Sequence, residues 1–491
     1  MRIKYLLPVV CCLFLMTGCR EKQDVVSVFP LKNYNQTLSD WIKPNDPDYD
    51  TPLMSSVVQQ QRLANFYKHT YGASSPWNPD YVKRILQAPK PDDLKTNEAA
   101  LIQLFNNKNK KNKEMGYGEN FRPYSENWIH KIAANINLAQ FDHLQYDAKN
   151  RAIAIDNLYA RVLPTDDVFF FHYKIAGQGY PFDNLQISAL WAGAPVYILT
   201  QTQDHAWSLV VTSDYIGWVK SSGLARVSEA FIKTWVTRAF KQLAAITHTK
   251  TSILDSNGVF RFSAYVGSVF PVADSANTLK IMIPVADAKQ QAVIEYATVN
   301  NNDAGILPIA PTKYNFSRII STLLGRPYGW GNLYFYNDCS SELKSLMTPF
   351  GIWLPRHSSD QVYAGKLTDL SKDSPKERIE YLMERGQPFT TIVYIDGHIL
   401  LFIGNFPNPN SDKHSLIPMT FQNMWGLKPD PSTRRAVIGK SVIFPMLEHF
   451  PEDSQLISQA AKKHFQMSEL GETANQLQKI EMIDLKDLMY P

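Results

Sequence analysis

The distribution of cysteines is the feature that most narrows what this chain can fold into. Three of its four cysteines lie within the first 19 positions, and Cys339 stands alone in the rest of the chain. A single thiol forms no internal disulfide, so packed apolar cores have to hold the fold. A hydrophobic content of 44% and an aromatic content of 12% fit such cores. The length of 491 residues predicts about three or four domains.

The first residues have the pattern of an export leader. Arg2 and Lys4 precede an apolar run, Tyr5 to Met16, which is too short to span a bilayer. The small residues Thr17 and Gly18 then precede Cys19. This order resembles the lipobox of bacterial lipoproteins, in which the cysteine is lipidated and becomes the mature N-terminus.

We therefore expect a signal peptide over 1–19 and a lipid anchor on Cys19. The protein would then sit on the periplasmic side of a bacterial membrane. The residue after Cys19 is Arg20 and not the aspartate that retains some lipoproteins at the inner membrane. This favours the outer membrane. The alternative is an ordinary secretory signal with an incidental Cys19. In an oxidising compartment a lone thiol at Cys339 is worth attention as a reactive group.

Charge and histidine spacing argue against two kinds of partner. The formal net charge of +4 is small for this length, so we expect no nucleic-acid partner. The basic cluster NNKNKKNKE, residues 106–114, is predicted to be a solvated loop; weak attraction to an anionic cell wall is the alternative. His130 and His143 have no partner at ligand spacing, so no metal or organic cofactor is implied.

The periodicity of apolar residues changes along the chain and divides it into regions. Three- and four-residue spacing predicts helices before about residue 150, and short alternating runs predict strands after it. The expected regions are a leader (1–19), a polar tether (20–39), a helical N-terminal domain (40–150), two small β-barrels (151–230 and 231–306), a mixed α+β domain (307–450) and a helical tail (451–491).

The first barrel carries a recognisable pattern. Residues 192–219, AGAPVYILTQTQDHAWSLVVTSDYIGWV, resemble bacterial SH3-like domains. Trp207 and Trp218 are predicted to lie in its core, with a wall-binding groove as the alternative. A similar rhythm of strands over 260–299 predicts a second barrel of the same kind.

The stretch YNDCSSEL places Cys339 at the start of a helix. Asp338 is a good cap, and an apolar stripe follows it: Leu343, Leu346, Met347 and Phe350. Unpaired N–H groups and the helix dipole favour a thiolate at this position and could hold an oxyanion. The neighbouring anion Asp338 opposes that effect, so a base is needed as well.

A histidine from elsewhere in the fold is the expected base. In FTTIVYIDGHILLFIGNF, Asp396-Gly397 is a strong hairpin signal, and His398 is the first residue of the returning strand. A rigid strand end can carry an imidazole toward a helix N-terminus. Alone, such a histidine would be an ordinary polar residue at the end of a hairpin.

Four motifs in this order resemble the NlpC family of bacterial papain-like cysteine endopeptidases. They are PYGWG, DCSS, LPRHSSDQ and GHILLFIG, between Pro327 and Gly404. The leader, the tripeptide SPW and the two SH3-like barrels resemble the multidomain lipoprotein branch of that family. The resemblance implies a multidomain α+β protein with a helical N-terminal domain, two SH3-like barrels and a papain-like peptidase domain.

The resemblance also implies a catalytic triad. Cys339 would be the nucleophile and His398 the base, and a polar residue three positions before Trp-Gly would orient the base. In FQNMWG that residue is Gln422. Asn423 would point to the opposite face of the strand, and His414 lies in a turn-like stretch.

Relatives with SH3-like domains before the peptidase typically cleave between D-glutamate and a diamino acid in peptides with a free N-terminal L-alanine. By resemblance, Asp338 would pair with the ammonium, while Tyr328, Ser340 and Ser358 would fix the peptide. His357 stands where relatives often carry another polar residue. The expected partners are peptidoglycan stem peptides or muropeptides and, through the lipid, a membrane; we expect a monomer.

Two other functions remain open from the sequence. The first is a non-catalytic wall-binding or scaffold lipoprotein, whose barrels supply the function. The second is an acyltransferase or amidase on the same papain-like core. The presence of both Cys339 and His398 favours the peptidase over the first, and analysis of products would separate it from the second.

Overall fold

The structure is a computed structural model that describes residues 26–172, 175, 177–275, 278–411, 415–428, 435–474 and 484–490. The predicted leader, Cys19 and His414 lie outside these ranges. Within them, no helix has both the length and the apolar character needed to cross a bilayer.

The chain from Val26 onward is packed, which corrects the tether predicted over 20–39 for its described part. Strand β1 (Val26–Val28) pairs in parallel with β20 (Arg435–Pro445) at the edge of a large sheet. Phe29 and Tyr34 are buried against Phe444. The short run Val26–Val28 has strand-forming residues and pairs with the edge of the sheet. The polar composition of the surrounding residues gave no sign of this pairing.

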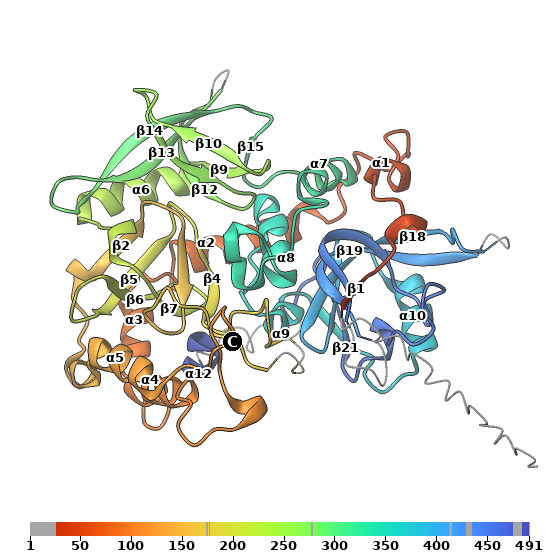
Figure 1. The fold of residues 1–491 in the computed structure, drawn as a ribbon. Coiled ribbons are helices and arrows are strands. Elements are labelled where there is room, and N and C mark those ends of the chain that lie inside the picture. Colours follow the sequence, from red (N-terminus) through yellow and green to blue (C-terminus); the bar gives the residue numbers. More distant parts are fainter. Residues whose placement is uncertain are drawn as a thin grey trace, which may run out of the picture.

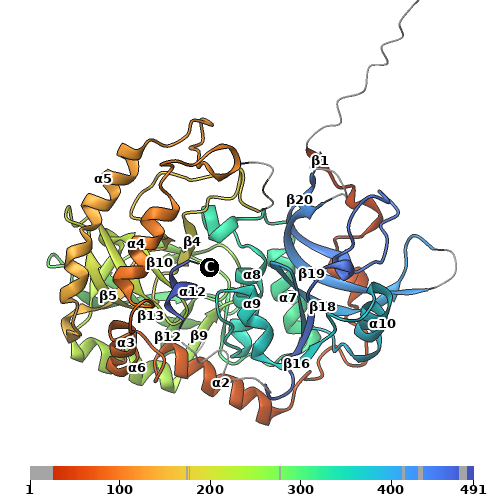
Figure 2. The same cartoon turned by 90° about the horizontal axis from the view of Figure 1, so that it is seen from below.

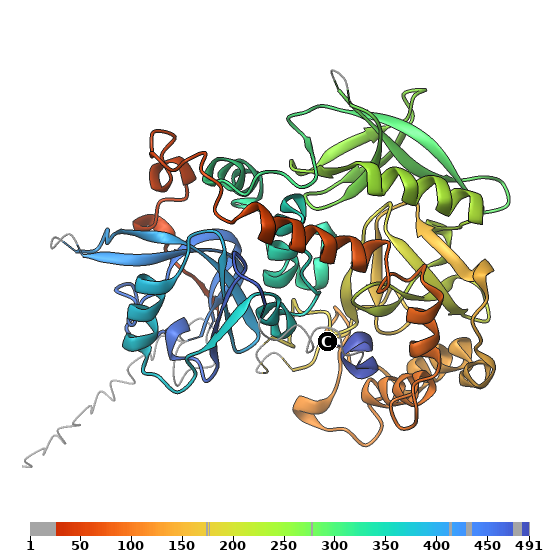
Figure 3. The ribbon, with the colours of Figure 1, turned by 180° about the vertical axis from the view of Figure 1, so that it is seen from behind.

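The N-terminal region is helical, as the sequence predicts, and its helices begin at polar caps. Side chains of Ser55, Asn78, Asp93 and Ser125 accept from the first turns of α2 to α5. The helices are α1 (Leu38–Trp41), α2 (Ser56–Thr70), α3 (Pro79–Leu86), α4 (Leu94–Leu104) and α5 (Glu126–Ile136). Helix α2 runs along the back of the molecule between the C-terminal domain and the barrels (Figure 3). Its buried Arg62 donates to the Leu470 carbonyl oxygen at 2.8 Å.

The first barrel is a seven-stranded antiparallel sheet in the order β4-β3-β7-β6-β5-β2-β8 (Figure 1). Its strands are β2 (Arg151–Ala154), β3 (Leu158–Arg161), β4 (Gln186–Leu190), β5 (Pro195–Gln201), β6 (Trp207–Val211), β7 (Ile216–Lys220) and β8 (Leu224–Arg226). Trp207 is 5% exposed and Trp218 is fully buried, so both lie in the core as predicted. Helices α3 to α5 share that core.

The second barrel combines a five-stranded sheet with a hairpin, β10–β11. Its strands are β9 (Leu243–Ile246), β10 (Thr251–Leu254), β11 (Phe260–Ala264), β12 (Val269–Asp274), β13 (Leu279–Ala286), β14 (Ala292–Val299) and β15 (Ala304–Ile306). The sequence prediction of strands alone missed helix α6 (Glu229–Lys241), capped by Ser228. Its buried residues Phe231, Trp235 and Ala239 recur at helical spacing, but many are aromatic, which suggested strands.

The C-terminal domain is a seven-stranded sheet, β1-β20-β19-β18-β17-β21-β16, with α8 packed on β18 and β19 (Figure 2). Its other strands are β16 (Lys366–Asp369), β17 (Thr391–Ile395), β18 (His398–Pro407), β19 (Leu416–Leu427) and β21 (Phe465–Glu469). Its helices are α7 (Lys313–Leu323), α8 (Cys339–Met347), α9 (Ser358–Gln361) and α10 (Pro375–Arg385). The apolar stripe predicted after Cys339 is completely buried.

In its described part, the region after Pro451 contains a strand as well as the helix that the sequence predicts for the tail. Strand β21 is inserted between β17 and β16, with Phe465 and Met467 buried. Short helix α12 (Leu485–Met489) then lies on the N-terminal helical domain. The alternation of apolar and polar residues in FQMSE is too short to predict a strand among the helix-forming residues around it. Pairing with both β16 and β17 overrides the local helix propensity.

Candidate active site

Cys339 is the first residue of α8. The side chain of Asp338 accepts from the Ser341 N–H at 3.0 Å, and the Ser341 hydroxyl accepts from the Asp338 N–H at 2.9 Å. This reciprocal cap fixes the helix start and orients the cysteine. The Cys339 side chain is nearly buried, with 8% exposure, and packs beside Ile399 and Leu343.

The environment of Cys339 favours the thiol over the thiolate. Burial, and then the charge of Asp338, raise the pKa of Cys339 to about 12. The N–H groups of Ile399 and Ser340 and the charge of Arg356 act in the opposite direction on this pKa. Attack by this sulfur therefore requires a base that removes the proton.

The predicted hairpin brings His398 to the cysteine. Ile395 and His398 face each other across a two-residue turn, Asp396-Gly397, with Gly397 at a φ of 70°. The N–H of Ile399, the residue that follows His398, lowers the pKa of Cys339, and α8 packs against β18. The start of β18 is therefore in contact with the start of α8, as the sequence predicts.

Gln422 fixes the tautomer of His398. Its Oε1 lies 2.7 Å from His398 Nε2, and its Nε2 donates to Thr420 Oγ1 at 2.8 Å. The Thr420 hydroxyl donates in turn to the Phe444 carbonyl, so it has to accept from the amide. Gln459 also donates to Gln422 Oε1, at 2.8 Å. Because Oε1 can only accept, His398 Nε2 carries the proton and Nδ1 is left as the basic nitrogen.

Burial lowers the pKa of His398 to about 4, while its bond to Gln422 acts the other way. The imidazole is therefore neutral at pH 7 and able to accept a proton. Asn423, on the other face of β19, donates instead to the Asn337 carbonyl oxygen at 2.8 Å. Gln422 is thus the residue of this strand that contacts the histidine.

Asp338 is held by Arg356 in a buried ion pair. Arg356 Nη2 lies 2.5 Å from Asp338 Oδ2, and both residues are at most 5% exposed. The same carboxylate accepts from the N–H groups of Gly331, at 3.1 Å, and Ser341. A substrate ammonium at Asp338, as predicted from sequence, would compete with Arg356 for a carboxylate that is already neutralised.

The other predicted substrate-binding residues surround the same point. Ser340 Oγ accepts from Arg356 Nη1 at 2.7 Å and donates to Asp338 Oδ1 at 3.3 Å. Burial raises the pKa of Tyr328, and the neighbouring Cys339 and Asp338 raise it further. Ser358 begins α9. Ser340 and Ser358 line the same cavity as Cys339, and the charges of Cys339 and Asp338 act on Tyr328.

A cavity of about 330 Å³ opens at Cys339. It is lined by parts of several domains: Gln186 and Ile187 of the first barrel, Trp330, Gly331, Asp338, Ser340, Arg356, His357, Ser358, Ser359, Asp360, Tyr394 and Gly397 of the C-terminal domain, and Asp487 of α12. Burial, and then Arg356, lower the pKa of His357 to about 4, so it is neutral at pH 7. Over the described ranges, no group of three or more acidic, histidine or cysteine side chains could hold a metal ion.

The first barrel crowds one end of this cavity. Phe182, 8% exposed, makes edge contacts with the rings of Trp330 at 5.3 Å and Trp425 at 5.6 Å. Gln186 Nε2 donates to the Gly331 carbonyl oxygen at 2.8 Å. A substrate therefore meets a wall of the barrel close to the cysteine.

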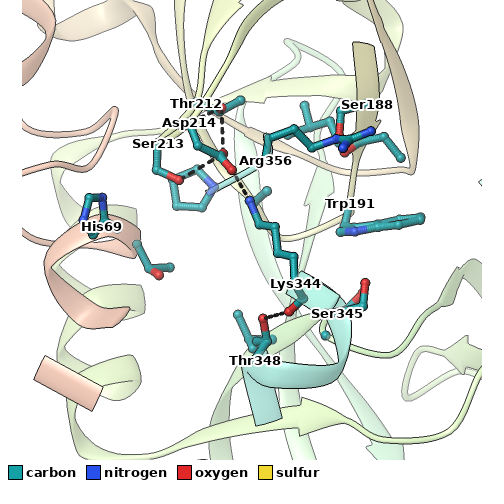
Figure 4. Close-up of a pocket in the computed structure, with 18 of the residues that line it drawn as sticks. His69, Ser188, Trp191, Thr212, Ser213, Asp214, Lys344, Ser345, Thr348 and Arg356 are labelled. Atoms are coloured by element: carbon teal, nitrogen blue, oxygen red, sulfur yellow. Dashed lines mark hydrogen bonds and ion pairs between the residues drawn. The ribbon is translucent and has the colours of Figure 1, made fainter. Parts of the chain in front are cut away.

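A second cavity, of about 160 Å³, lies behind α8 and shows how the barrel is attached (Figure 4). Lys344 of α8 forms an ion pair with the buried Asp214 of the first barrel. Arg356 Nε donates to Ser188 Oγ at 3.0 Å and its Nη2 to the Ile187 carbonyl oxygen at 3.0 Å. The same arginine thus ties the barrel to the cap of α8.

Sequence reasoning missed three residues of the site. Arg356 was part of a quoted motif, and a basic residue directly after the apolar run IWLP was a signal of a buried charge. Gln459 and Asp487 belong to the region predicted as a helical tail, where no local pattern links them to Cys339. Tertiary contacts alone bring them to the site.

Family comparisons match three regions. The N-terminal NLPC_P60 stabilising domain matches residues 8–141, an SH3 domain of the SH3b1 type matches 169–220, and an SH3 domain of the SH3b2 type matches 228–276. The two SH3 matches fall on the first barrel and on the start of the second. No curated protein is similar enough in sequence to count as a match.

Solved structures give similarity over most of the chain. An NlpC/P60 endopeptidase from Photobacterium damselae subsp. piscicida is 28% identical, with a TM-score of 0.76, over 91% of this chain and 100% of that one. An NlpC/P60 family protein from Bacillus cereus is 14% identical, with a TM-score of 0.41, over 63% of this chain and 98% of that one.

Proposed function

The chain belongs to the NlpC/P60 family, whose members are generally cysteine peptidases of the cell wall, and on that premise we propose a reaction for it. It hydrolyses the bond between γ-D-glutamate and a diamino acid, diaminopimelate, in peptidoglycan stem peptides that have a free N-terminal L-alanine. The observation that carries this proposal is the neutral His398, oriented by Gln422, on the strand that packs against α8, whose first residue is Cys339.

In the proposed mechanism, His398 Nδ1 takes the Cys339 proton as the sulfur attacks the γ-carbonyl carbon. The Cys339 N–H, at the unpaired first turn of α8, stabilises the oxyanion. The C–N bond breaks, and the departing amine takes the proton from the imidazole. Water, deprotonated by the same nitrogen, then releases L-Ala-D-Glu from the thioester.

The wall formed by the first barrel favours the proposal that the substrate is a small peptide and not intact peptidoglycan. Phe182 fills the space between Trp330 and Trp425, and Gln186 and Ile187 line the cavity itself. A stem peptide still attached to a glycan strand would have to pass this wall. We therefore favour trimmed muropeptides, and a role in turnover or recycling of the wall.

We also propose that Cys19 carries a lipid that anchors the enzyme on the periplasmic side of a bacterial membrane, with the outer membrane favoured. Labelling of cells with a radioactive fatty acid tests this directly. Label on the wild-type protein and none on Cys19→Ser is the expected result. Label on neither would leave an ordinary secreted enzyme.

The substrate is tested with L-Ala-γ-D-Glu-diaminopimelate, its N-acetylated form and purified cell-wall sacculi, using mass spectrometry to identify products. Release of L-Ala-D-Glu from the free peptide alone is the expected result. Equal cleavage of the acetylated peptide would remove the requirement for a free N-terminus. Cleavage of sacculi would contradict the restriction to trimmed muropeptides.

A further inference from the structure

We propose that the C-terminal segment 484–490 forms one wall of the active site and that Asp487 pairs with an ammonium group of the peptide. This inference rests on the proposed peptidase function and adds a specificity-determining residue to it. The group recognised is a cation of the substrate, either its N-terminal amine or the distal amine of its diamino acid.

Helix α12 is held in place by apolar contacts with the N-terminal domain. Leu485 and Met489 are 2% and 3% exposed and belong to the core that α3 to α5 share with the first barrel. The ring of Tyr490 makes an edge contact with Phe105, with centroids 5.8 Å apart. Asp484 caps the helix by accepting from the Lys486 N–H at 3.0 Å. Residues 484–490 are therefore an ordered part of the surface, far from Cys339 in sequence.

This docking puts Asp487 in the cavity that contains Cys339. Figure 1 shows the C-terminus between the N-terminal helices and α9. Another cavity, of about 460 Å³, adjoins the Cys339 cavity, since both are lined by His357, Asp360 and Asp487. Asp487 thus stands at the junction of the two cavities.

The described lining of the Cys339 cavity supplies no basic side chain that pairs with Asp487, although Lys68 and Arg84 line the adjoining cavity. Arg356 is the one permanently charged base among its described lining residues, and Asp338 already neutralises it. His357 is neutral at pH 7, and Asp360 interacts with other groups. In the described ranges, no basic side chain forms an ion pair with Asp487. A substrate that brings a positive charge would fill this gap.

The surroundings of Asp487 raise the pKa of its carboxyl group. Its side chain is exposed at the rim of the cavity, where a ligand can reach it. Partial burial, and then Asp484, raise its pKa, while Lys486 acts in the opposite direction. The charge of a bound ammonium would lower this pKa and so oppose both effects, whereas a neutral peptide would not.

The test measures binding by calorimetry to the uncleaving variant Cys339→Ala, with and without Asp487→Asn. Three peptides are compared: L-Ala-γ-D-Glu-diaminopimelate, its N-acetylated form, and a form with 2-aminopimelate, which lacks the distal amine. Because the pair is exposed, we expect Asp487→Asn to raise the Kd of the first peptide about two- to fivefold. The peptide that lacks the recognised amine should bind both proteins equally, which identifies that amine.

Two matched changes separate a charge effect from damage to α12. Asp484→Asn removes a neighbouring charge that lies outside the Cys339 cavity and keeps a capping side chain, so it should raise the Kd less than Asp487→Asn does. Asp487→Glu should restore binding. The effect of Asp487→Asn should also shrink at about 0.5 M salt, where exposed charges are screened.

An unchanged Kd for the first peptide in Asp487→Asn would overturn this inference and leave the proposed function intact. Equal weakening for all three peptides would also overturn it, because it would indicate a structural role. If Cys339→Ala binds none of the peptides, the proposed substrate class fails and the inference fails with it.

Discussion

The guanidinium of Arg356 lies 2.5 Å from the carboxylate of Asp338. Asp338 immediately precedes Cys339, the predicted nucleophile, in the sequence. This pair joins three parts of the site: the cap of α8, the side chain of Ser340 and the first barrel. It also moderates Asp338, whose charge raises the pKa of Cys339 while that of Arg356 lowers it. The ion pair therefore has a structural role and sets the electrostatics of the thiol.

Removing Arg356 should destabilise the protein strongly. Arg356→Met leaves the Asp338 carboxylate buried without its cation, and we expect the free energy of unfolding to fall by about 3–5 kcal/mol. The double variant Arg356→Met with Asp338→Asn should recover part of this loss. Urea unfolding of the wild type, the two single variants and the double variant provides the measurement. A cost for Arg356→Met that is the same with and without the Asp338→Asn change would mean that the two side chains are not coupled.

The rate of peptide cleavage should depend on pH through His398. Its pKa is lowered to about 4, so kcat/KM should fall only as the pH decreases through about 4, when the base becomes protonated, and stay level around pH 7. The profile of kcat/KM against pH measures this. An acidic limb near the ordinary histidine pKa of about 6.5 would contradict it.

Alkylation of Cys339 by iodoacetamide tests the protonation state of the thiol, as the pH profile tests that of His398. Because the pKa of Cys339 is raised to about 12, the resting enzyme holds a thiol, and the rate should be low at pH 7 and increase with pH. A fast rate that is independent of pH between about 5 and 8 would instead reveal a resting thiolate–imidazolium pair.

Loss of the Gln422 side chain should reduce turnover more than substrate binding. Gln422→Ala frees the His398 ring to rotate and to change tautomer, so we expect kcat to fall roughly ten- to a hundredfold with little change in KM. Gln466→Ala, which removes an amide from an exposed contact with Asp369 in the same sheet, is the control. Equal kcat values for the two variants would remove Gln422 from the catalytic group.

Glu98 should make the stability of the protein depend on pH. Burial raises its pKa from 4.5 to about 8, so the folded protein holds a neutral acid at pH 7 that ionises on unfolding. Its contribution is fully present below about pH 4.5 and is lost as the pH rises toward 8, by about 1.4 kcal/mol per pH unit. Glu98→Gln, which can still accept from Trp218, should lose this dependence. Urea unfolding at pH 5 and pH 8 compares the two proteins, and parallel behaviour would contradict the assignment.

Much of the peptidase site could be predicted because its signals are local. A cap before Cys339 and the Asp396-Gly397 turn before His398 each depend on a few adjacent residues. The FQNMWG motif likewise led to Gln422, which lies beside His398 in the structure. The core positions of Trp207 and Trp218 were predicted from the resemblance of residues 192–219 to SH3-like domains.

The rest depended on contacts between distant segments. Nothing near Asp487 in sequence indicates that α12 lies on the N-terminal domain beside the cysteine. Arg356 belongs to a motif, but its partner Asp338 was predicted to be available for substrate because the charge of a neighbouring segment cannot be placed from sequence. Strand β21 was missed since its edge partners, β16 and β17, lie far before it in the chain.

The central claim is that Cys339 is the nucleophile that cleaves a stem peptide. The most direct test incubates purified residues 20–491, as wild type and as Cys339→Ala, with L-Ala-γ-D-Glu-diaminopimelate and follows the products by mass spectrometry. We predict that the wild type releases L-Ala-D-Glu and diaminopimelate and that the variant releases neither. Equal release by both proteins, or no release by the wild type, would contradict the account.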